Sequence, residues 1–301
     1  MPYRLKRKEN TAAGMRRIAR EQIDCALAEL SQDSPASGDT VHQVRKRIKK
    51  LRALVRLLKP CLGRGIDKYW NHRLRAMGHA LAGSRDADVM LQTLAGLERE
   101  LHDGGTDIDL SGARVALLAR QSRQEYANSE QRTPPDQVVA DGLADLRSQL
   151  RDWSLPQSGF GLAGPGFKKI YKRGRCALRK ARRRPGDRQF HDWRKRVKDH
   201  WYHCRLLRYL WPEPMRTRAA ELKILSGLLG DEHDLAVFRQ TLTTLPDATL
   251  SPAESGVLHA AIRDRQRGLR AAALKLGMRV YAEKPACIHK RFRRYAQAAR
   301  T

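Results

Sequence analysis

The sequence predicts an all-α fold built from two repeated helical bundles. Most of its 301 residues follow the 3.6-residue hydrophobic period of amphipathic helices, and the alternation typical of strands is scarce. Three sequence segments recur in the same order in the two halves of the chain, as a duplicated unit would produce. A stretch rich in Pro and Gly separates these halves. Together these observations favour duplicated helices over any fold that contains a sheet.

Helix-breaking residues divide the chain into two sets of expected helices. Residues 1–153 form the expected N-terminal bundle, residues 154–166 a linker and residues 167–301 the C-terminal bundle, all within one domain. In the first bundle, we expect helices at 11–31, 40–60, 64–82, 85–102, 111–131 and 136–152. In the second, we expect helices at 167–184, 188–210, 214–229, 232–244, 252–276 and 285–299.

The repeated segments show how the two halves correspond. The first two pairs are offset by 152 and 149 residues, and the third requires one inserted residue in its second copy. The pairs are Gly14–Ile18 with Gly166–Ile170, His42–Lys49 with His191–Lys198, and Leu81–Val89 with Leu228–Val237. Ordered matches at nearly constant spacing predict two halves that face each other across a pseudo-twofold axis.

The charge balance indicates an anionic partner. The chain has 60 Lys and Arg against 32 Asp and Glu, which gives a net charge of +28. Self-repulsion of this size destabilises a compact state, and its usual benefit is attraction of nucleic acid, an anionic membrane or polyphosphate. No run of eighteen apolar residues occurs and no apolar segment follows the basic N-terminus, so we expect neither a membrane span nor a signal peptide. The five widely spaced cysteines are expected to be reduced, in a cytoplasmic protein.

Two basic stripes carry the strongest functional signal. In the expected helix at 40–60, basic side chains recur three and four residues apart, which places them on one helix face. An apolar residue precedes each of them, so a packing stripe runs alongside. The pattern recurs 149 residues later with Trp201 as its one exception. The first stripe is His42, Arg45, Lys49, Arg52, Arg56 and Lys59; the second is His191, Arg194, Lys198, Trp201, Arg205 and Arg208.

A solvated charged face is the alternative interpretation of such stripes. Solvent-facing helices usually mix charges, because like charges three or four residues apart repel by a few tenths of a kcal/mol. Residues 42–59 contain no Asp or Glu. We therefore predict that the stripes line an anion channel in which His42 and His191 hydrogen-bond phosphate, a structural role for these histidines being the alternative.

A third basic stripe follows the expected linker. It consists of Lys168, Lys172, Arg175, Arg179 and Arg182, again three and four residues apart. The first-half positions that match its last three members are apolar, namely Ile23, Leu27 and Leu30. We therefore expect the C-terminal half to contribute more charge to the site.

The paired His-x-x-Arg-Lys-x-x-Lys helices, with Arg-Asp-Ala-Asp-Val at 85–89 and His-Asp-Leu-Ala-Val at 233–237, resemble the CHAD family of histidine-containing α-helical domains. The resemblance runs from about Ala12 to Tyr295. It implies two four-helix-type bundles related by a pseudo-twofold axis around a basic central cavity that binds inorganic polyphosphate, with association to polyphosphate granules. CHAD domains also occur beside CYTH triphosphate-tunnel enzymes. Since the chain lacks the alternating strands of such an enzyme, it resembles a stand-alone member.

We accordingly expect non-catalytic binding of inorganic polyphosphate, without a cofactor or a metal. Asp86 and Asp234 are expected to orient arginines of the stripes. The predicted polyphosphate-binding residues are His42, Arg45, Lys46, Lys49, Arg52, Arg56, Lys168, Lys172, Arg175, Arg179, His191, Arg194, Lys195, Lys198, Arg205 and Arg208.

Nucleic acid is the main competing partner, since its phosphates are attracted by the same charge. However, no helix-turn-helix, zinc-finger or RNP signature occurs, and aromatic residues make up only 6% of the chain, so a stacking platform for bases is not evident. A membrane-surface role is weaker still, because the basic helices have no spare aromatic-rich face.

Two kinds of metal chemistry are further alternatives. His42 and His191 could share a divalent cation if they met, but their cationic surroundings oppose this. Asp86, Asp88, Asp231 and Asp234 could hold Mg²⁺ for hydrolysis. Helix capping is the favoured interpretation of these acids, with Gly83 and Gly230 ending helices and Ser84 or Asp231 starting the next ones.

Overall fold

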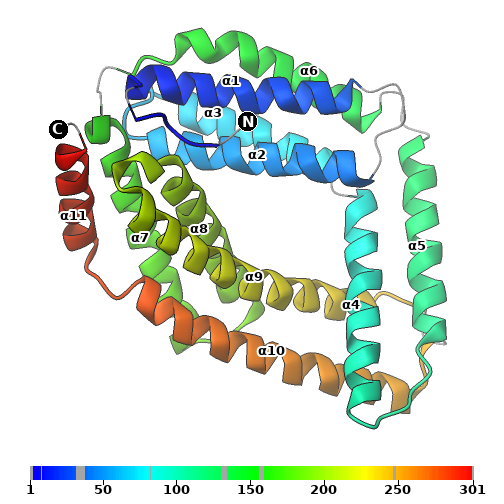
Figure 1. The fold of residues 1–301 in the computed structure, drawn as a ribbon. Helices are drawn as coiled ribbons and strands as arrows, with labels where there is room; N and C mark the ends of the chain where they lie inside the picture. Colours follow the sequence, from blue (N-terminus) through cyan, green and yellow to red (C-terminus); the bar gives the residue numbers. More distant parts are fainter. Residues whose placement is uncertain are drawn as a thin grey trace.

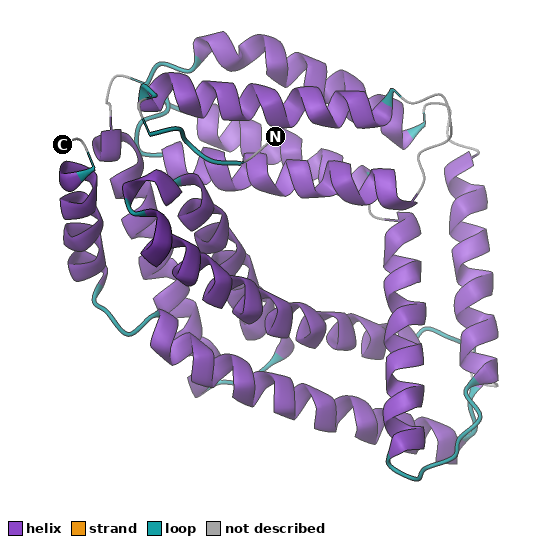
Figure 2. Cartoon of the chain, in the orientation of Figure 1, coloured by secondary structure: helices purple, strands orange, loops and turns teal. Residues whose placement is uncertain are grey.

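The computed structural model describes residues 3–7, 9–31, 38–81, 83–129, 134–155, 159–246 and 249–299. Within these residues the fold is all-α and contains no strand, which confirms the predicted fold class (Figure 2). The described residues include no helix that is long and apolar enough to cross a membrane.

The two halves of the chain contain helices in a similar order. The first half comprises α1 Thr11–Leu30, α2 Gly38–Leu58, α3 Ile66–Ala80, α4 Gly83–Asp103, α5 Ser111–Ser129, α6 Pro135–Ser148 and the 3₁₀ turn η1 Gln149–Asp152. The second comprises α7 Gly159–Arg183, α8 Asp187–Leu206, the 3₁₀ turn η2 Arg208–Leu210, α9 Pro212–Leu242, α10 Pro252–Val280 and α11 Pro285–Ala298.

Two predictions about breaks in the chain are wrong. Most of the expected linker at 154–166 is helical, because α7 already begins at Gly159. Pro165 has no N–H group to donate to the carbonyl oxygen of Gly161. Because Gly161 lies near the helix start and is exposed, solvent can take this role. The helices expected at 214–229 and 232–244 are one helix, α9, which passes through Gly230. A helical glycine costs only about 1 kcal/mol, and packing of the buried leucines on either side outweighs it.

Two hydrophobic cores hold the molecule together, and each takes residues from both halves. The larger core joins α1, α2, α3 and α6 to α7, α8, α11 and the first half of α9. The smaller core joins α4 and α5 to the far ends of α9 and α10. Figure 1 shows the α4–α5 hairpin standing at one side of the molecule, where α9 and α10 reach it. Neither half therefore encloses a core of its own.

The contacts between helices follow a similar order in the two halves of the chain. In the first half α1 packs on α2 and α6, and in the second α7 packs on α8 and α11. Likewise α4 packs on α5, and α9 packs on α10. Helix α2 lies between the halves, because it contacts both α7 and α8 (Figure 1).

The contact between α2 and α7 depends on Gly166. This buried glycine lies so close to α2 that an added Cβ would be 1.8 Å from the carbonyl oxygen of Leu57. Backbone atoms cannot yield as a flexible side chain can, so only glycine fits at this position. The lack of a side chain at Gly166 therefore allows the close approach of α2 and α7.

We predict that Gly166→Ala lowers the free energy of unfolding by about 3 kcal/mol, because the new methyl group overpacks the α2–α7 contact. Gly227→Ala is the matched control, since nothing lies within 4 Å of a Cβ added there in α9. Alanine leaves the unfolded backbone less conformational freedom than glycine does, so the control should be about 0.5–1 kcal/mol more stable than the natural protein. Urea denaturation of both variants measures the difference, and equal stabilities would contradict the close contact.

Candidate anion-binding site

The candidate site is organised by the crossing of α2 and α8. Arg56 of α2 donates a 2.6 Å hydrogen bond from Nη1 to Oδ1 of Asp199 in α8. One helical turn further, His203 Nε2 lies 2.8 Å from the carbonyl oxygen of Ala53 and serves as its donor. Both contacts lie in the second halves of the two helices, so α2 and α8 meet near their C-terminal ends (Figure 1).

Asp199 is the acidic centre of this crossing. Its side chain is only 5% exposed, and it also accepts a 3.3 Å hydrogen bond at Oδ2 from Arg196 Nη1. One buried carboxylate thus serves two guanidinium groups, from α2 and α8. Neither Asp199 nor Arg196 was predicted from the sequence. The signal that could have identified Asp199 is its position as an isolated acid in the strongly basic second half of α8.

Cations outnumber this single acid. Burial, followed by the charge of Arg56, lowers the pKa of Arg52 to about 10. Burial also lowers the pKa of Arg196, and the positive charge of Arg173 in α7 acts in the same direction. We define the central cluster as Arg52, Arg56, Arg173, Arg196 and Asp199. Its four guanidinium groups face one carboxylate, so it retains a positive charge that an anion can neutralise.

Two arginine donors on α2 and α8 are left without acceptors. The Nε atoms of Arg52 and Arg194 are buried, and no described group forms a hydrogen bond with either of them. Buried donors normally have partners, and a bare one costs about 1–3 kcal/mol. Phosphate oxygens accept hydrogen bonds at many angles and would satisfy such groups.

The first parts of the two stripes lie away from this contact, toward the N-terminal ends of α2 and α8. His42 precedes Ala53 by eleven positions and His191 precedes His203 by twelve, which is about 17 and 18 Å along an α-helix. No described group of three His, Cys, Asp or Glu residues could hold a metal ion.

Each of these ends is anchored on a corresponding part of its own half. Arg45 Nη1 donates a 3.0 Å hydrogen bond to the carbonyl oxygen of Leu81, just after α3. Arg194 lies beside Gly230 of α9, where an added Cβ would be 3.9 Å from its Nε atom. Leu81 and Gly230 both belong to the third repeated sequence segment, so each arginine lies beside one copy of that segment.

His191 stacks against a histidine that the sequence analysis did not select. The rings of His191 and His233 have centroids 4.1 Å apart and are tilted by 33°. Burial, the charge of His191 and the charge of Arg194 lower the pKa of His233 to about 3. Burial likewise lowers the pKa of His191, assisted by Lys195 and Arg194. Burial therefore favours the neutral form of both rings.

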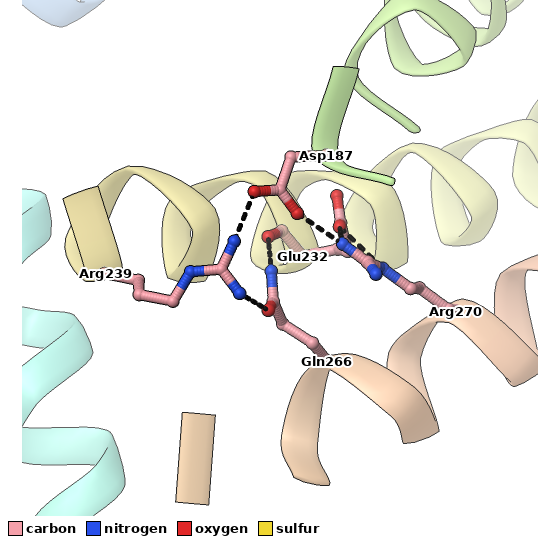
Figure 3. A network of polar contacts seen from close by, with 5 residues as sticks. All are labelled: Asp187, Glu232, Arg239, Gln266 and Arg270. Carbon is pink, nitrogen blue, oxygen red and sulfur yellow. Dashed lines mark hydrogen bonds and ion pairs between the residues drawn. The ribbon is translucent and has the colours of Figure 1, made fainter. Parts of the chain in front are cut away.

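A buried ionic network fixes the start of α8 and thus the position of His191 (Figure 3). Arg270 of α10 donates to Asp187 at 2.6 Å and to the buried Glu232 of α9 at 2.6 and 2.9 Å. Arg239 of α9 donates to the other oxygen of Asp187 at 2.5 Å. Gln266 of α10 accepts from Arg239 at 3.3 Å and donates to the Glu232 carbonyl oxygen at 3.4 Å. These interactions join α8, α9 and α10 at the start of the second stripe.

Several other predicted residues also interact within the protein. Lys46 Nζ donates to Gln43 at 2.8 Å, and Lys195 Nζ donates to Asp192 at 3.2 Å. Lys49 and Lys198 are half-buried on the stripe faces and have further interactions of their own.

The C-terminal end of the second stripe differs from the predicted pattern. The guanidinium carbon of Arg205 lies 5.3 Å from the ring centroid of Trp201, so the tryptophan supports a cation rather than breaking the stripe. Arg208 belongs to the expected helix at 188–210 but lies outside α8, which ends at Leu206, and instead starts η2.

The third predicted stripe does not face the central cluster. The positive charge of Arg173 acts on Arg196 of the cluster, whereas Lys168, Lys172, Arg175 and Arg179 lie roughly 100–160° from Arg173 around α7. Their side of the helix faces α10 and α11, as a 3.1 Å hydrogen bond from Arg175 Nε to the carbonyl oxygen of Tyr281 shows. The structure therefore separates this stripe from the other two.

The acids expected to orient stripe arginines belong to α4 and α9. Asp234 is half-buried on α9 and interacts with its surroundings. The side chain of Asp86 lies outside the described residues. Asp231 is exposed inside α9 and caps no helix, which corrects the capping expectation in the second half. The acid that does hold stripe and cluster arginines is Asp199.

Comparisons with known proteins agree with this fold. The family model of the CHAD domain matches residues 17–243. PptA from Streptomyces chartreusis has a TM-score of 0.61 at 15% sequence identity, covering 91% of this chain and 100% of that one. A crystal structure of the CHAD domain from the plant Ricinus communis has a TM-score of 0.60 at 18% identity, covering 94% of this chain and 96% of that one. No curated protein matches the chain.

An all-α fold in which two basic helices meet through a buried carboxylate defines the class of protein. The family model covers most of the chain, and the chain therefore belongs to the CHAD domain family. This confirms the resemblance inferred from the paired histidine motifs. The two solved structures support the same fold at low sequence identity.

Asp199→Asn is expected to lower the free energy of unfolding by about 3 kcal/mol, because it leaves two largely buried guanidinium groups without their counter-charge. Asp192→Asn is the control in the same helix, since Asp192 pairs with Lys195 in an exposed ion pair. Such a surface pair contributes less than about 1 kcal/mol. Thermal and urea denaturation at pH 7 compare the variants, and similar decreases in stability would show that Asp199 does not organise the crossing.

The buried His203 should make stability sensitive to acid. Burial lowers its pKa from 6.5 to about 4, so the unfolded chain binds more protons between these pH values. Stability should fall as pH drops through this window, by up to about 1.4 kcal/mol per pH unit. Between pH 7 and 5, the free energy of unfolding of His203→Gln should fall by about 2 kcal/mol less than that of the natural protein. The glutamine keeps a donor for the carbonyl oxygen of Ala53.

Urea denaturation at the two pH values measures this difference. His72→Gln, at an exposed position in α3, controls for the general effect of removing a histidine. An unchanged acid sensitivity in His203→Gln would show that another group is responsible.

Proposed function

We propose that this protein binds inorganic polyphosphate without catalysing its turnover, at the central cluster and along the α2 and α8 stripes. The observation that carries the proposal is the excess of partly buried guanidinium groups over carboxylates at the crossing, together with donors that have no acceptor. A bound polyanion would supply both the missing charge and the missing acceptors. Membership of the CHAD family supports polyphosphate as that polyanion.

The chemistry of polyphosphate suits this arrangement. It presents a flexible row of phosphate oxygens and no bases, so Lys and Arg side chains at many angles can bind it. Binding would release condensed counterions and weaken as salt is added. The acids near the site support a non-catalytic role, since Asp187, Asp199 and Glu232 are all engaged with arginines.

We also propose that the two halves are a duplication, related by a pseudo-twofold axis that passes near Ala53 and His203 and lies beside a basic central cavity. The 149-residue offset supports this, because it relates Lys50 to Asp199 and Arg56 to Arg205. The Arg56–Asp199 ion pair therefore corresponds to a contact between Lys50 and Arg205. Burial and then the charges of Arg47 and Arg205 lower the pKa of Lys50 to about 8, as expected for this contact.

The proposed location is cytoplasmic, with association to polyphosphate granules through the same site. Nucleic acid remains the competing ligand, and the structure adds no feature that favours it. An RNA competitor therefore belongs in the binding experiment. Assaying released phosphate in the same samples tests the non-catalytic role.

The central test is calorimetric titration of Arg45→Gln/Arg194→Gln with polyphosphate. Removing two charge-assisted hydrogen bonds should weaken binding at least about 100-fold, because each contributes about 1.5–3 kcal/mol. The slope of log K against log[salt] should also become less steep by about 1.5, roughly 0.7 for each phosphate that is no longer neutralised.

Arg99→Gln/Arg263→Gln removes the same charge from exposed positions in α4 and α10 and serves as the matched control. Equal weakening in both double variants would mean that bulk charge, not this site, binds the ligand. Displacement of polyphosphate by RNA at equal phosphate concentration would assign the site to nucleic acid instead.

A further inference from the structure

Helix α7 is an unusually one-sided cationic element. Its 25 residues include nine Lys and Arg and no Asp or Glu. None of these cations forms an ion pair with a carboxylate of the described residues. In the comparably long α10, by contrast, Arg265, Arg267 and Arg270 each pair with an acid. Repulsion along α7 opposes folding, so stability does not explain its composition.

The second element of this surface is α11, which also lacks Asp and Glu. It is anchored on α7 by Phe292, whose ring centroid lies 4.8 Å from that of Phe167. His289 of α11 lies where the two helices meet. Its pKa is lowered by burial and then by the positive charges of Lys168 and Arg293. Cations of both helices therefore converge at this junction.

Few acids are available to neutralise this surface. Glu283, in the segment between α10 and α11, is already paired with Arg291. Lys168, Lys172, Arg179 and Arg293 are exposed to solvent. We define the α7–α11 face as Lys168, Lys172, Arg175, Arg179, His289 and Arg293.

Arg173 connects this face to the central cluster. It lies on the side of α7 that faces Arg196, while its neighbour Lys172 belongs to the α7–α11 face. A chain of phosphates could thus pass from the cluster across the edge of α7. Once there, it would follow cations spread over twelve residues from Lys168 to Arg179, about 17 Å of helix.

We propose that the α7–α11 face binds the distal part of a long polyphosphate chain whose other part lies in the central cluster. This inference rests on the proposed function, and it adds that the protein selects ligands by chain length. A short polyphosphate reaches the central cluster alone. A long one occupies both surfaces, and the second set of interactions forms within one complex at high effective concentration.

The test compares tripolyphosphate with long-chain polyphosphate on the full-length protein. The variant Lys172→Gln/Arg179→Gln/Arg293→Gln removes three cations of the α7–α11 face. Its affinity for the long chain should fall at least about tenfold more than its affinity for tripolyphosphate. The salt slope for the long chain should become less steep by about 2, roughly 0.7 for each of the three phosphates that these cations neutralise.

The control Arg99→Gln/Lys223→Gln/Arg263→Gln removes three exposed cations from α4, α9 and α10. An equal fall in long-chain preference in this control would overturn the proposal. An unchanged preference in the α7–α11 variant would also overturn it, while weakened binding of both ligands by Arg45→Gln/Arg194→Gln would leave the proposed function intact. Failure of the natural protein to bind either ligand would instead reject the proposed function itself. Thermal denaturation confirms that each variant is folded.

Discussion

The carboxylate of Asp199, held between Arg56 and Arg196, is the interaction on which the arrangement of basic helices depends. Two helices that each carry a row of cations repel one another when they cross. A buried acid at the crossing converts part of that repulsion into attraction, and the hydrogen bond from His203 to the Ala53 carbonyl adds a neutral contact beside it. Because a single carboxylate faces several guanidinium groups, the crossing is held together without being neutralised. The remaining positive charge is what an anionic ligand can use.

The rest of the fold supports this crossing from both sides. Gly166 allows α7 to approach the backbone of α2, and the network around Asp187 and Glu232 ties the start of α8 to α9 and α10. Each hydrophobic core takes residues from both halves, so neither half can place its stripe without the other. The binding surface is therefore a property of the whole domain, even though its sequence motif occurs once in each half.

Charge and stability work against each other in this protein. Burial lowers the pKa of Lys50, Arg52 and Arg196, which shows that the folded state holds these cations at a cost. A ligand that neutralises them relieves the cost and binds more tightly for it. The cations of α7, which form no ion pair with a carboxylate of the described residues, also repel one another on a more exposed surface. An anionic ligand would reduce that repulsion too. A protein selected for stability alone would place acids among these residues, as α10 does.

The sequence by itself determined the helical fold, the repeated motifs and the basic faces of α2 and α8, because these depend on local periodicity and composition. His42, Arg45, His191 and Arg194 could be selected from spacing alone. Only the tertiary structure decided where the two helices meet, which places Asp199 between Arg56 and Arg196, and that the α7 stripe faces α11. Asp199 and His233 escaped selection for the same reason, since their partners come from other parts of the chain. Periodicity reports which face of a helix a residue occupies, whereas the neighbour of that face is set by long-range packing, as Gly166 and the continuous α9 illustrate.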